Sequence, residues 1–187
     1  MPAQSPHDLL AQARHLATKD VGIPEQASLR RAVSTAYYAL FHLLVSEASA
    51  LLASGDGKLQ HLVARAFEHG DMLKACSTFA SGGALPGLAD THYGGVMVPP
   101  ELRAVARAFV DLQGNRHDAD YATHRGWTRT EALTEVERAE GAFESWGVVS
   151  PTGLGRRANA RALSAPERET VRLFLAWLVL QKRLGSR

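Results

Sequence analysis

The stretch of sequence that decides the fold is residues 31–42, which read Arg31-Ala32-Val33-Ser34-Thr35-Ala36-Tyr37-Tyr38-Ala39-Leu40-Phe41-His42. It lies within a longer segment, 25–53, whose apolar residues recur at spacings of three and four over several turns. That period predicts a helix. Because the apolar stripe is wide, we expect this helix to be central and buried on more than one side. The apolar positions are Val33, Ala36, Tyr37, Leu40, Phe41, Leu44, Ala48 and Leu51.

Five further segments are predicted to be helical, and no segment is predicted to be a strand. Ser5 is placed to cap the first of them, and two later ones begin with the spacing of a capping box. A loop is expected at 77–98, where five glycines occur without a lasting period. The five segments are about 6–19, 58–76, one opening at Pro99-Pro100-Glu101, one from Thr128 to Trp146, and one starting near residue 165.

These segments predict an all-α protein. Residues 1–149 are expected to form an antiparallel bundle of about five helices around the long central one. Residues 150–187 are expected to form a basic linker and a C-terminal helix, packed on the bundle or on a partner chain.

Composition narrows the class of protein. The longest apolar run, Phe174–Leu180, has seven residues, whereas a membrane span needs about 20, so we expect no membrane association. The N-terminus has no basic region followed by an apolar block, which argues against a secretory signal. Cys76 is the only cysteine and is expected to be a small buried side chain. Together these features predict a cytoplasmic protein.

Charge is unevenly distributed along the chain. Residues 1–155 carry 13 Lys and Arg against 17 Asp and Glu, and residues 156–187 carry 8 against 2. A basic end on a mildly acidic body can contact an RNA backbone or an acidic partner, or it can be a solvated Arg-rich face. The candidate contact residues are Arg156, Arg157 and Arg161.

Two clusters of polar residues could carry chemistry. On the central helix, Tyr37, Tyr38 and His42 lie within two turns, and Tyr38 and His42 share a face because they are four residues apart. On the helix that opens at Pro99, the apolar rhythm Leu102, Val105, Phe109 and Leu112 continues at Arg116, so an arginine stands where the apolar seam should go on. Such violations of the pattern are often functional.

The second cluster supports two interpretations. Guanidinium can grip a phosphate with two hydrogen bonds, and imidazole can move protons near neutral pH. Alternatively, Arg116 pairs with Asp120 four residues on and ends the helix. The ionisable and aromatic candidates here are Arg116, His117, Asp120, Tyr121, His124 and Arg125.

Several familiar chemistries have no motif in this sequence. No HExxH, no histidine and cysteine arrangement suited to zinc, no phosphate-binding glycine motif and no nucleophile elbow occur. We therefore expect no metal and no cofactor.

The two segments 31–42 and 116–121 together resemble small prokaryotic members of the HEPN family, named for its higher-eukaryote and prokaryote nucleotide-binding domains. The second segment, Arg116-His117-Asp118-Ala119-Asp120-Tyr121, is a form of the family's Arg-x(4)-Tyr pattern. The resemblance covers roughly residues 5–147. It implies a helical bundle that dimerises through the faces bearing the arginine motif.

In active family members an arginine, the polar residue after it and a histidine cleave RNA without metal, through attack of the ribose 2′-hydroxyl on the adjacent phosphate. The resemblance places Arg116 at the phosphate and His117 at the polar position. The family's histidine should fall at 121–123, where this chain has Tyr121, Ala122 and Thr123, and His124 lies one residue beyond the usual limit. A phenol ordinarily stays protonated at neutral pH and is a poor general base.

The resemblance therefore leaves three functions open. The first is a HEPN-like ribonuclease of a toxin–antitoxin or defence system. The second is a non-catalytic domain that binds RNA or a protein partner, such as an antitoxin or a small nucleotidyltransferase. The third is nucleotide binding by the bundle, which the missing phosphate loop disfavours. For the first two, the residues of the central helix expected to contribute to binding are Tyr38 and His42.

Overall fold

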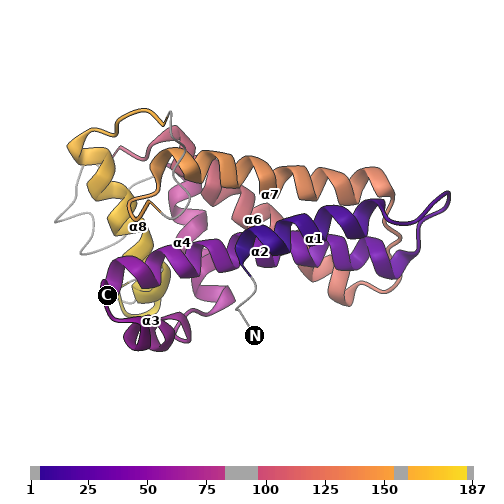
Figure 1. Cartoon of the computed structure of the whole chain (residues 1–187), viewed down its shortest axis with the longest axis horizontal. Coiled ribbons are helices and arrows are strands. Elements are labelled where there is room, and N and C mark those ends of the chain that lie inside the picture. Colours follow the sequence, from indigo (N-terminus) through magenta and orange to yellow (C-terminus); the bar gives the residue numbers. More distant parts are fainter. Residues whose placement is uncertain (1–4, 83–96, 154–159, 185–187) are drawn as a thin grey trace. The chain divides into compact units, whose positions relative to one another are not determined.

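The structure is a computed structural model that describes residues 5–82, 97–153 and 160–184 (Figure 1). In this part of the chain every regular element is a helix, so the all-α prediction is confirmed. The predicted loop at 77–98 falls largely outside the described residues, although its first residues continue a helix to Ser81. The helices are α1 (Pro6–Thr18), α2 (Gln26–Leu52), α3 (Gly57–Ala64), α4 (His69–Ser81), α6 (Pro100–Tyr121), α7 (Arg129–Val149) and α8 (Ala165–Leu184).

The predicted helix at 58–76 is wrong in one respect, because the chain forms two helices there. Leu62 and Met72 both fall within the predicted helix, but Leu62 is 64% exposed and Met72 is fully buried. The chain leaves the helix after Ala64, buries Phe67, and starts α4 at His69. The apolar residues of 62–73 therefore do not form one buried helical face.

The predicted helix starts are confirmed by their caps. Ser5 and Asp8 form a reciprocal pair of hydrogen bonds at the start of α1. At the start of α7, the Thr128 amide donates to the Glu131 carboxylate at 2.7 Å and the Glu131 amide donates to Thr128 Oγ1 at 3.2 Å. Ser164 and Glu167 repeat this arrangement before α8. These side chains satisfy amide groups that a helix start leaves without partners.

The chain divides into two compact units. Unit 1 comprises Met1–Leu43 and Ala108–Phe143, and unit 2 comprises Leu44–Arg107 and Glu144–Arg187. The division falls within α2, α6 and α7, so each of these helices contributes residues to both units. The boundary at residue 149 that the sequence suggested stays a prediction.

Unit 1 is built around the first half of α2. Side chains of α1, α6 and α7 complete its core, and Tyr37 is fully buried with its ring 5.5 Å from that of Phe109. Arg14 of α1 and Glu140 of α7 form a two-pronged ion pair at 2.6 and 2.5 Å. The fully buried core residues include Ala13, Leu29, Val33, Ala36, Tyr37, Leu40, Phe109, Leu112, Val136 and Ala139.

Unit 2 contains the C-terminal helix. α8 packs against α4, and the rings of Phe174 and Phe79 meet edge to face at 5.1 Å. Cys76 is fully buried as expected, and burial raises the pKa of its thiol well above the usual range, so it serves as a core side chain. Phe174 and Leu178 are fully buried here as well, so α8 is part of the unit 2 core.

Within the described residues, α2 is the single helix whose length and composition would allow it to span a membrane. In the structure 67% of its most apolar window is buried. Burial against protein explains its apolar character, as it does for the core helix of a globular unit.

Candidate functional site

A stripe of polar residues runs along the otherwise apolar first half of α2. Arg30, Ser34, Tyr38 and His42 follow one another at intervals of four, which keeps them near one side of the helix. The first three contact the C-terminal end of α6 or the turn after it, all within unit 1. The candidate site lies where this stripe meets α6.

Arg116 is held at the centre of this contact. Its Nη2 donates to the Tyr38 hydroxyl at 3.0 Å, and its Nε lies 2.7 Å from the Asp120 carboxylate. The guanidinium carbon is 5.5 Å from the centre of the Tyr38 ring and 5.7 Å from that of Tyr121. Only 18% of the Arg116 side chain is exposed. The predicted i,i+4 pair of Arg116 and Asp120 is therefore present, and α2 supplies a second partner.

Asp120 links the two helices. One carboxylate oxygen lies against Arg116, and the other accepts a hydrogen bond from Ser34 Oγ at 2.5 Å. The chain Ser34–Asp120–Arg116–Tyr38 thus begins and ends on α2 and passes through α6. A network with partners on both sides fixes the guanidinium more firmly than a single surface pair would.

The electrostatics of this network favour the charged guanidinium. Burial acts against the charged form of Arg116, but Tyr38 and Asp120 outweigh it, and the pKa of the guanidinium is raised. The site therefore keeps a fixed positive charge whose nearest opposite charge is one carboxylate, 28% exposed. A phosphate that displaced this carboxylate would meet a preformed two-pronged donor.

Tyr121 and His117 lie beside Arg116 at the surface. Tyr121 is 61% exposed, and its ring centre is 4.9 Å from that of His117. The phenol and the imidazole are therefore neighbours at the end of α6, accessible to a ligand. This pair is the part of the site with groups able to exchange protons.

The other predicted histidines are placed differently. The His42 ring stacks on Tyr38 at 6.3 Å, so the predicted shared face is confirmed, and burial lowers the pKa of this imidazole. His124 is exposed in the turn after α6 and forms no hydrogen bond, ion pair or ring contact in the part of the chain that the structure describes.

The side chain of Arg125 contacts residues outside the candidate site. Its guanidinium lies 4.1 Å from the centre of the Trp127 ring and 2.5 Å from the Asp118 carboxylate. Trp127 is buried, its amide donates to Gln26 Oε1, and its carbonyl accepts from Gln26 Nε2, each at 2.8 Å. Arg125 therefore helps to hold the turn between α6 and α7.

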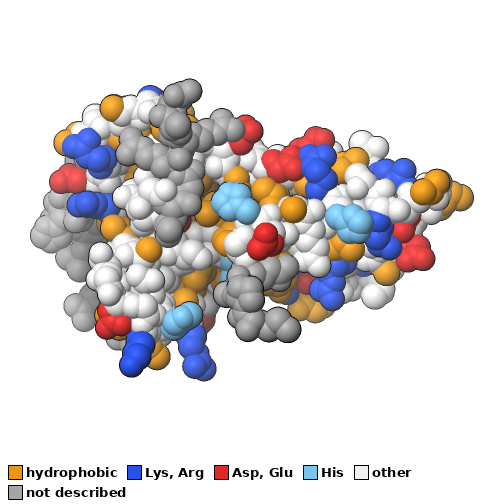
Figure 2. Space-filling view, in the orientation of Figure 1, with side chains coloured by type: hydrophobic (Ala, Val, Ile, Leu, Met, Phe, Trp, Pro, Cys, Tyr) orange, Lys and Arg blue, Asp and Glu red, His pale blue; other side chains and the backbone are white. Residues whose placement is uncertain are grey.

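Of the three basic C-terminal residues predicted to contact RNA or a partner, the structure describes one. Arg156 and Arg157 lie outside the described residues. Arg161 forms two-pronged pairs with Glu101 and Glu167, at distances from 2.8 to 3.2 Å. Hydrogen bonds from Arg161 lower the pKa of Glu167 to about 2. The charge of Arg161 is thus matched by two carboxylates of unit 2. Figure 2 shows acidic and basic side chains intermixed on one face of the protein.

Two residues of the site were missed by the reading of the sequence. Ser34 stands inside the opening segment, yet nothing in its neighbours reveals that Asp120 is its partner. Arg30 donates hydrogen bonds to the carbonyls of four residues at the end of α6 and in the turn after it, namely Ala119, Ala122, Thr123 and Arg125. The one feature of the sequence that could have indicated both residues is the four-residue spacing that Arg30 and Ser34 share with Tyr38 and His42.

No family model, curated protein or solved structure matches this chain. The described residues contain no group of three or more His, Cys, Asp or Glu side chains placed to hold a metal ion. The chemical groups that the site offers are the fixed guanidinium of Arg116 and, beside it, the exposed phenol of Tyr121 and imidazole of His117.

Proposed function

We propose that this chain is a HEPN-like domain of a prokaryotic toxin–antitoxin or defence system that binds RNA at Arg116 and cleaves it without metal. The observation that carries the proposal is the fixing of Arg116 by Tyr38 and Asp120 next to the exposed His117 and Tyr121. The resemblance of segments 31–42 and 116–121 to that family supports it.

In this proposal each residue has a role set by its chemistry. Arg116 binds the scissile phosphate and stabilises the charge that develops on it. His117 and Tyr121 lie where they can take the proton of the attacking 2′-hydroxyl or give one to the leaving oxygen. The requirement for a 2′-hydroxyl makes RNA the substrate in place of DNA.

A second copy of the chain is the expected partner at this site. Tyr121 keeps 61% of its surface exposed although it is a large aromatic residue. Contact of two copies at this face would bring two Arg116 groups to one phosphate backbone. Sedimentation of the purified chain should give a dimer, and Tyr121→Asp should shift it to the monomer. A monomer at all concentrations would contradict this part of the proposal.

The test uses the full chain, a labelled RNA and excess chelator. Cleavage should occur and leave a cyclic phosphate, detectable by phosphorus NMR, and an RNA with a 2′-deoxy residue at the cleaved position should stay intact. Arg116→Ala should abolish cleavage. Arg31→Ala is the matched control, because Arg31 is exposed on α2 and no contact of its side chain is among those described. Equal cleavage by the two variants would refute the nuclease.

A second function is favoured by a specific observation. Asp120 already pairs with Arg116, and no hydrogen bond joins a histidine to Arg116 among the described residues. These facts suit a domain that binds RNA or a protein partner such as an antitoxin or nucleotidyltransferase without turnover. In that case RNA binding would be lost in Arg116→Ala while no form of the chain cleaves RNA.

The basic end is tested by substitution because deletion would remove core residues. α8 buries Phe174, Leu175 and Leu178, so a truncated chain would lose part of unit 2. The double variant Arg156→Gln, Arg157→Gln keeps α8 intact. Weaker RNA binding at low salt, with a smaller salt dependence, would support a phosphate contact there.

A further inference from the structure

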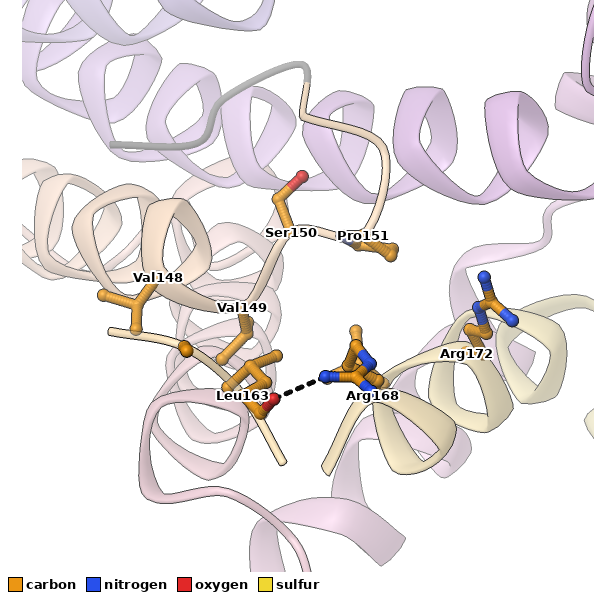
Figure 3. A pocket seen from close by; sticks show the side chains of 9 residues that line it. Val148, Val149, Ser150, Pro151, Leu163, Arg168 and Arg172 are labelled. Carbon is orange, nitrogen blue, oxygen red and sulfur yellow. Dashed lines mark hydrogen bonds between the residues drawn. The ribbon is translucent and has the colours of Figure 1, made fainter. Parts of the chain in front are cut away.

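A cavity of about 180 Å³ lies in unit 2 (Figure 3). It is formed by the end of α7 and the turn after it, by the segment before α8, and by the first turns of α8. Val148, Pro151 and Leu163 supply its accessible apolar surface, whereas Val149 and Val171, which also line it, are fully buried. An apolar cavity of about 150 Å³ is large enough to take benzene. A phenyl ring or a branched alkyl group therefore fits here.

Two arginines line the same cavity, one turn apart on α8. Arg168 Nη1 donates to the Leu163 carbonyl at 2.6 Å, which leaves its charge without an opposite charge (Figure 3). Arg172 forms no hydrogen bond or ion pair in the described part of the chain. Both arginines are exposed at the rim of the cavity, where a guanidinium can form a two-pronged pair with the anionic group of a ligand.

Among the described residues no ion pair joins a carboxylate to Arg168 or Arg172, although Glu167 and Glu169 lie near them in the sequence of α8. Glu167 is bound by Arg161 on the other side of the start of α8. Glu47 is fully buried behind Ser150, and its two oxygens accept hydrogen bonds from the hydroxyls of Ser150 and Thr152. The cavity therefore combines apolar walls with two positive charges that no carboxylate of the described residues pairs with.

We propose that this cavity binds a small organic monocarboxylate that carries one apolar group of about the size of a phenyl ring. The apolar group lies against Val148, Pro151 and Leu163, and the carboxylate forms a two-pronged pair with Arg172. A nucleotide is too large for a cavity of about 180 Å³. The proposal is independent of the RNA site around Arg116, because none of the residues that line the cavity belongs to unit 1.

Phenylacetate is the probe, titrated into the full chain and followed by calorimetry and by NMR of the backbone amides. We expect saturable binding with a Kd of about 1 mM, a value typical of a ligand with so few heavy atoms. Benzyl alcohol lacks the charge and acetate lacks the ring, so each should bind at least about tenfold more weakly. The backbone amides of residues 148–150 and 162–172, apart from Pro166, should shift most.

Two variants separate the parts of the site. Arg172→Gln should weaken phenylacetate binding about tenfold, whereas Arg65→Gln, which removes an exposed charge elsewhere in unit 2, should leave it unchanged. Ala162→Phe fills the cavity from an exposed position and keeps both arginines, and it should abolish binding. Circular dichroism confirms that each variant is folded.

Three results would overturn the proposal. The first is the absence of saturation with phenylacetate in the folded chain. The second is equal binding by the Arg172→Gln and Arg65→Gln variants. The third is a short peptide with a C-terminal phenylalanine binding more than about tenfold tighter than phenylacetate, since the ligand would then be a protein terminus. RNA cleavage or binding is not part of the readout, so the two proposals fail separately.

Discussion

Arg30 and Arg116 are two partly buried arginines of unit 1 that differ in the groups that accept their hydrogen bonds. Arg30 donates to four main-chain carbonyls at the end of α6 and in the following turn. Arg116 is bound by a phenol hydroxyl and a carboxylate. The last carbonyls of a helix lack donors within the helix and are fixed by the backbone, whereas side-chain oxygens can turn away and be hydrated. Arg30 is therefore a structural residue, and Arg116 can exchange its partners for a ligand.

The comparison also shows where a motif search can mislead. Arg30 stands next to the resemblance segment and contributes several hydrogen bonds to the fold. Arg116 interrupts an apolar seam and contributes fewer. Arg30 is therefore expected to matter most for stability and Arg116 for ligand binding, and the variants below test that difference.

The largest effect is expected for Arg30→Met. Loss of the guanidinium leaves the carbonyls at the end of α6 without their charged donor, so the free energy of unfolding should fall by about 3 kcal/mol. Urea denaturation measures this change, and Arg31→Met, on the exposed side of α2, should alter stability by less than about 0.5 kcal/mol. A loss below about 1 kcal/mol for Arg30→Met would show that the turn holds itself in place.

A smaller loss of stability is expected for Arg116→Ala. The groups it leaves behind, Asp120 and Tyr38, are partly exposed and can be hydrated, so the free energy of unfolding should fall by only about 1 kcal/mol. RNA binding, measured by fluorescence anisotropy at low salt, should weaken at least about tenfold. Stability loss as large as that of Arg30→Met would make Arg116 a structural residue as well.

Asp120→Asn should distinguish the contribution of Arg116 to stability from its contribution to RNA binding. The amide keeps the shape of Asp120 but removes the charge that competes with a phosphate, so RNA should bind a few times more tightly. Unfolding free energy should fall by about 0.5 kcal/mol because an ion pair is lost. Weaker RNA binding would mean that the carboxylate positions Arg116 and does not compete for it.

The smallest effect is expected from His42. Burial lowers the pKa of this imidazole in the folded protein below its unfolded value of 6.5. Its contribution to stability is therefore present above pH 6.5 and is lost as the pH falls through the lowered folded value. His42→Gln should reduce the slope of the unfolding free energy against pH between about pH 7.5 and pH 5. An unchanged slope would contradict the assignment.

Much of the fold could be predicted from local patterns. The long helix α2 follows from apolar spacing, and the starts of α1, α7 and α8 follow from capping residues three positions apart. The division between α3 and α4 was not predicted, because one helix was expected over about 58–76. Only packing decides that Leu62 is exposed and Met72 is buried.

The site was predictable in its residues and not in its contacts. Arg116, Asp120 and Tyr38 were identified from their positions, and the pairing of Arg116 with Asp120 follows from a spacing of four along one helix. The partner of Ser34 is 86 residues away along the chain, and that of Arg30 is 89. Contacts at such separations depend on how α2 packs against α6, which no local spacing encodes.

The sequence by itself determined that this protein is helical, where most of its helices begin, and that an arginine interrupts the apolar seam of α6. These properties depend on interactions between residues three or four apart. The tertiary structure alone decided that Arg30 fixes the end of α6, that Tyr38 and Asp120 hold Arg116, and that Arg172 lines a cavity together with apolar side chains. Those outcomes depend on which polar groups meet once apolar surfaces have packed.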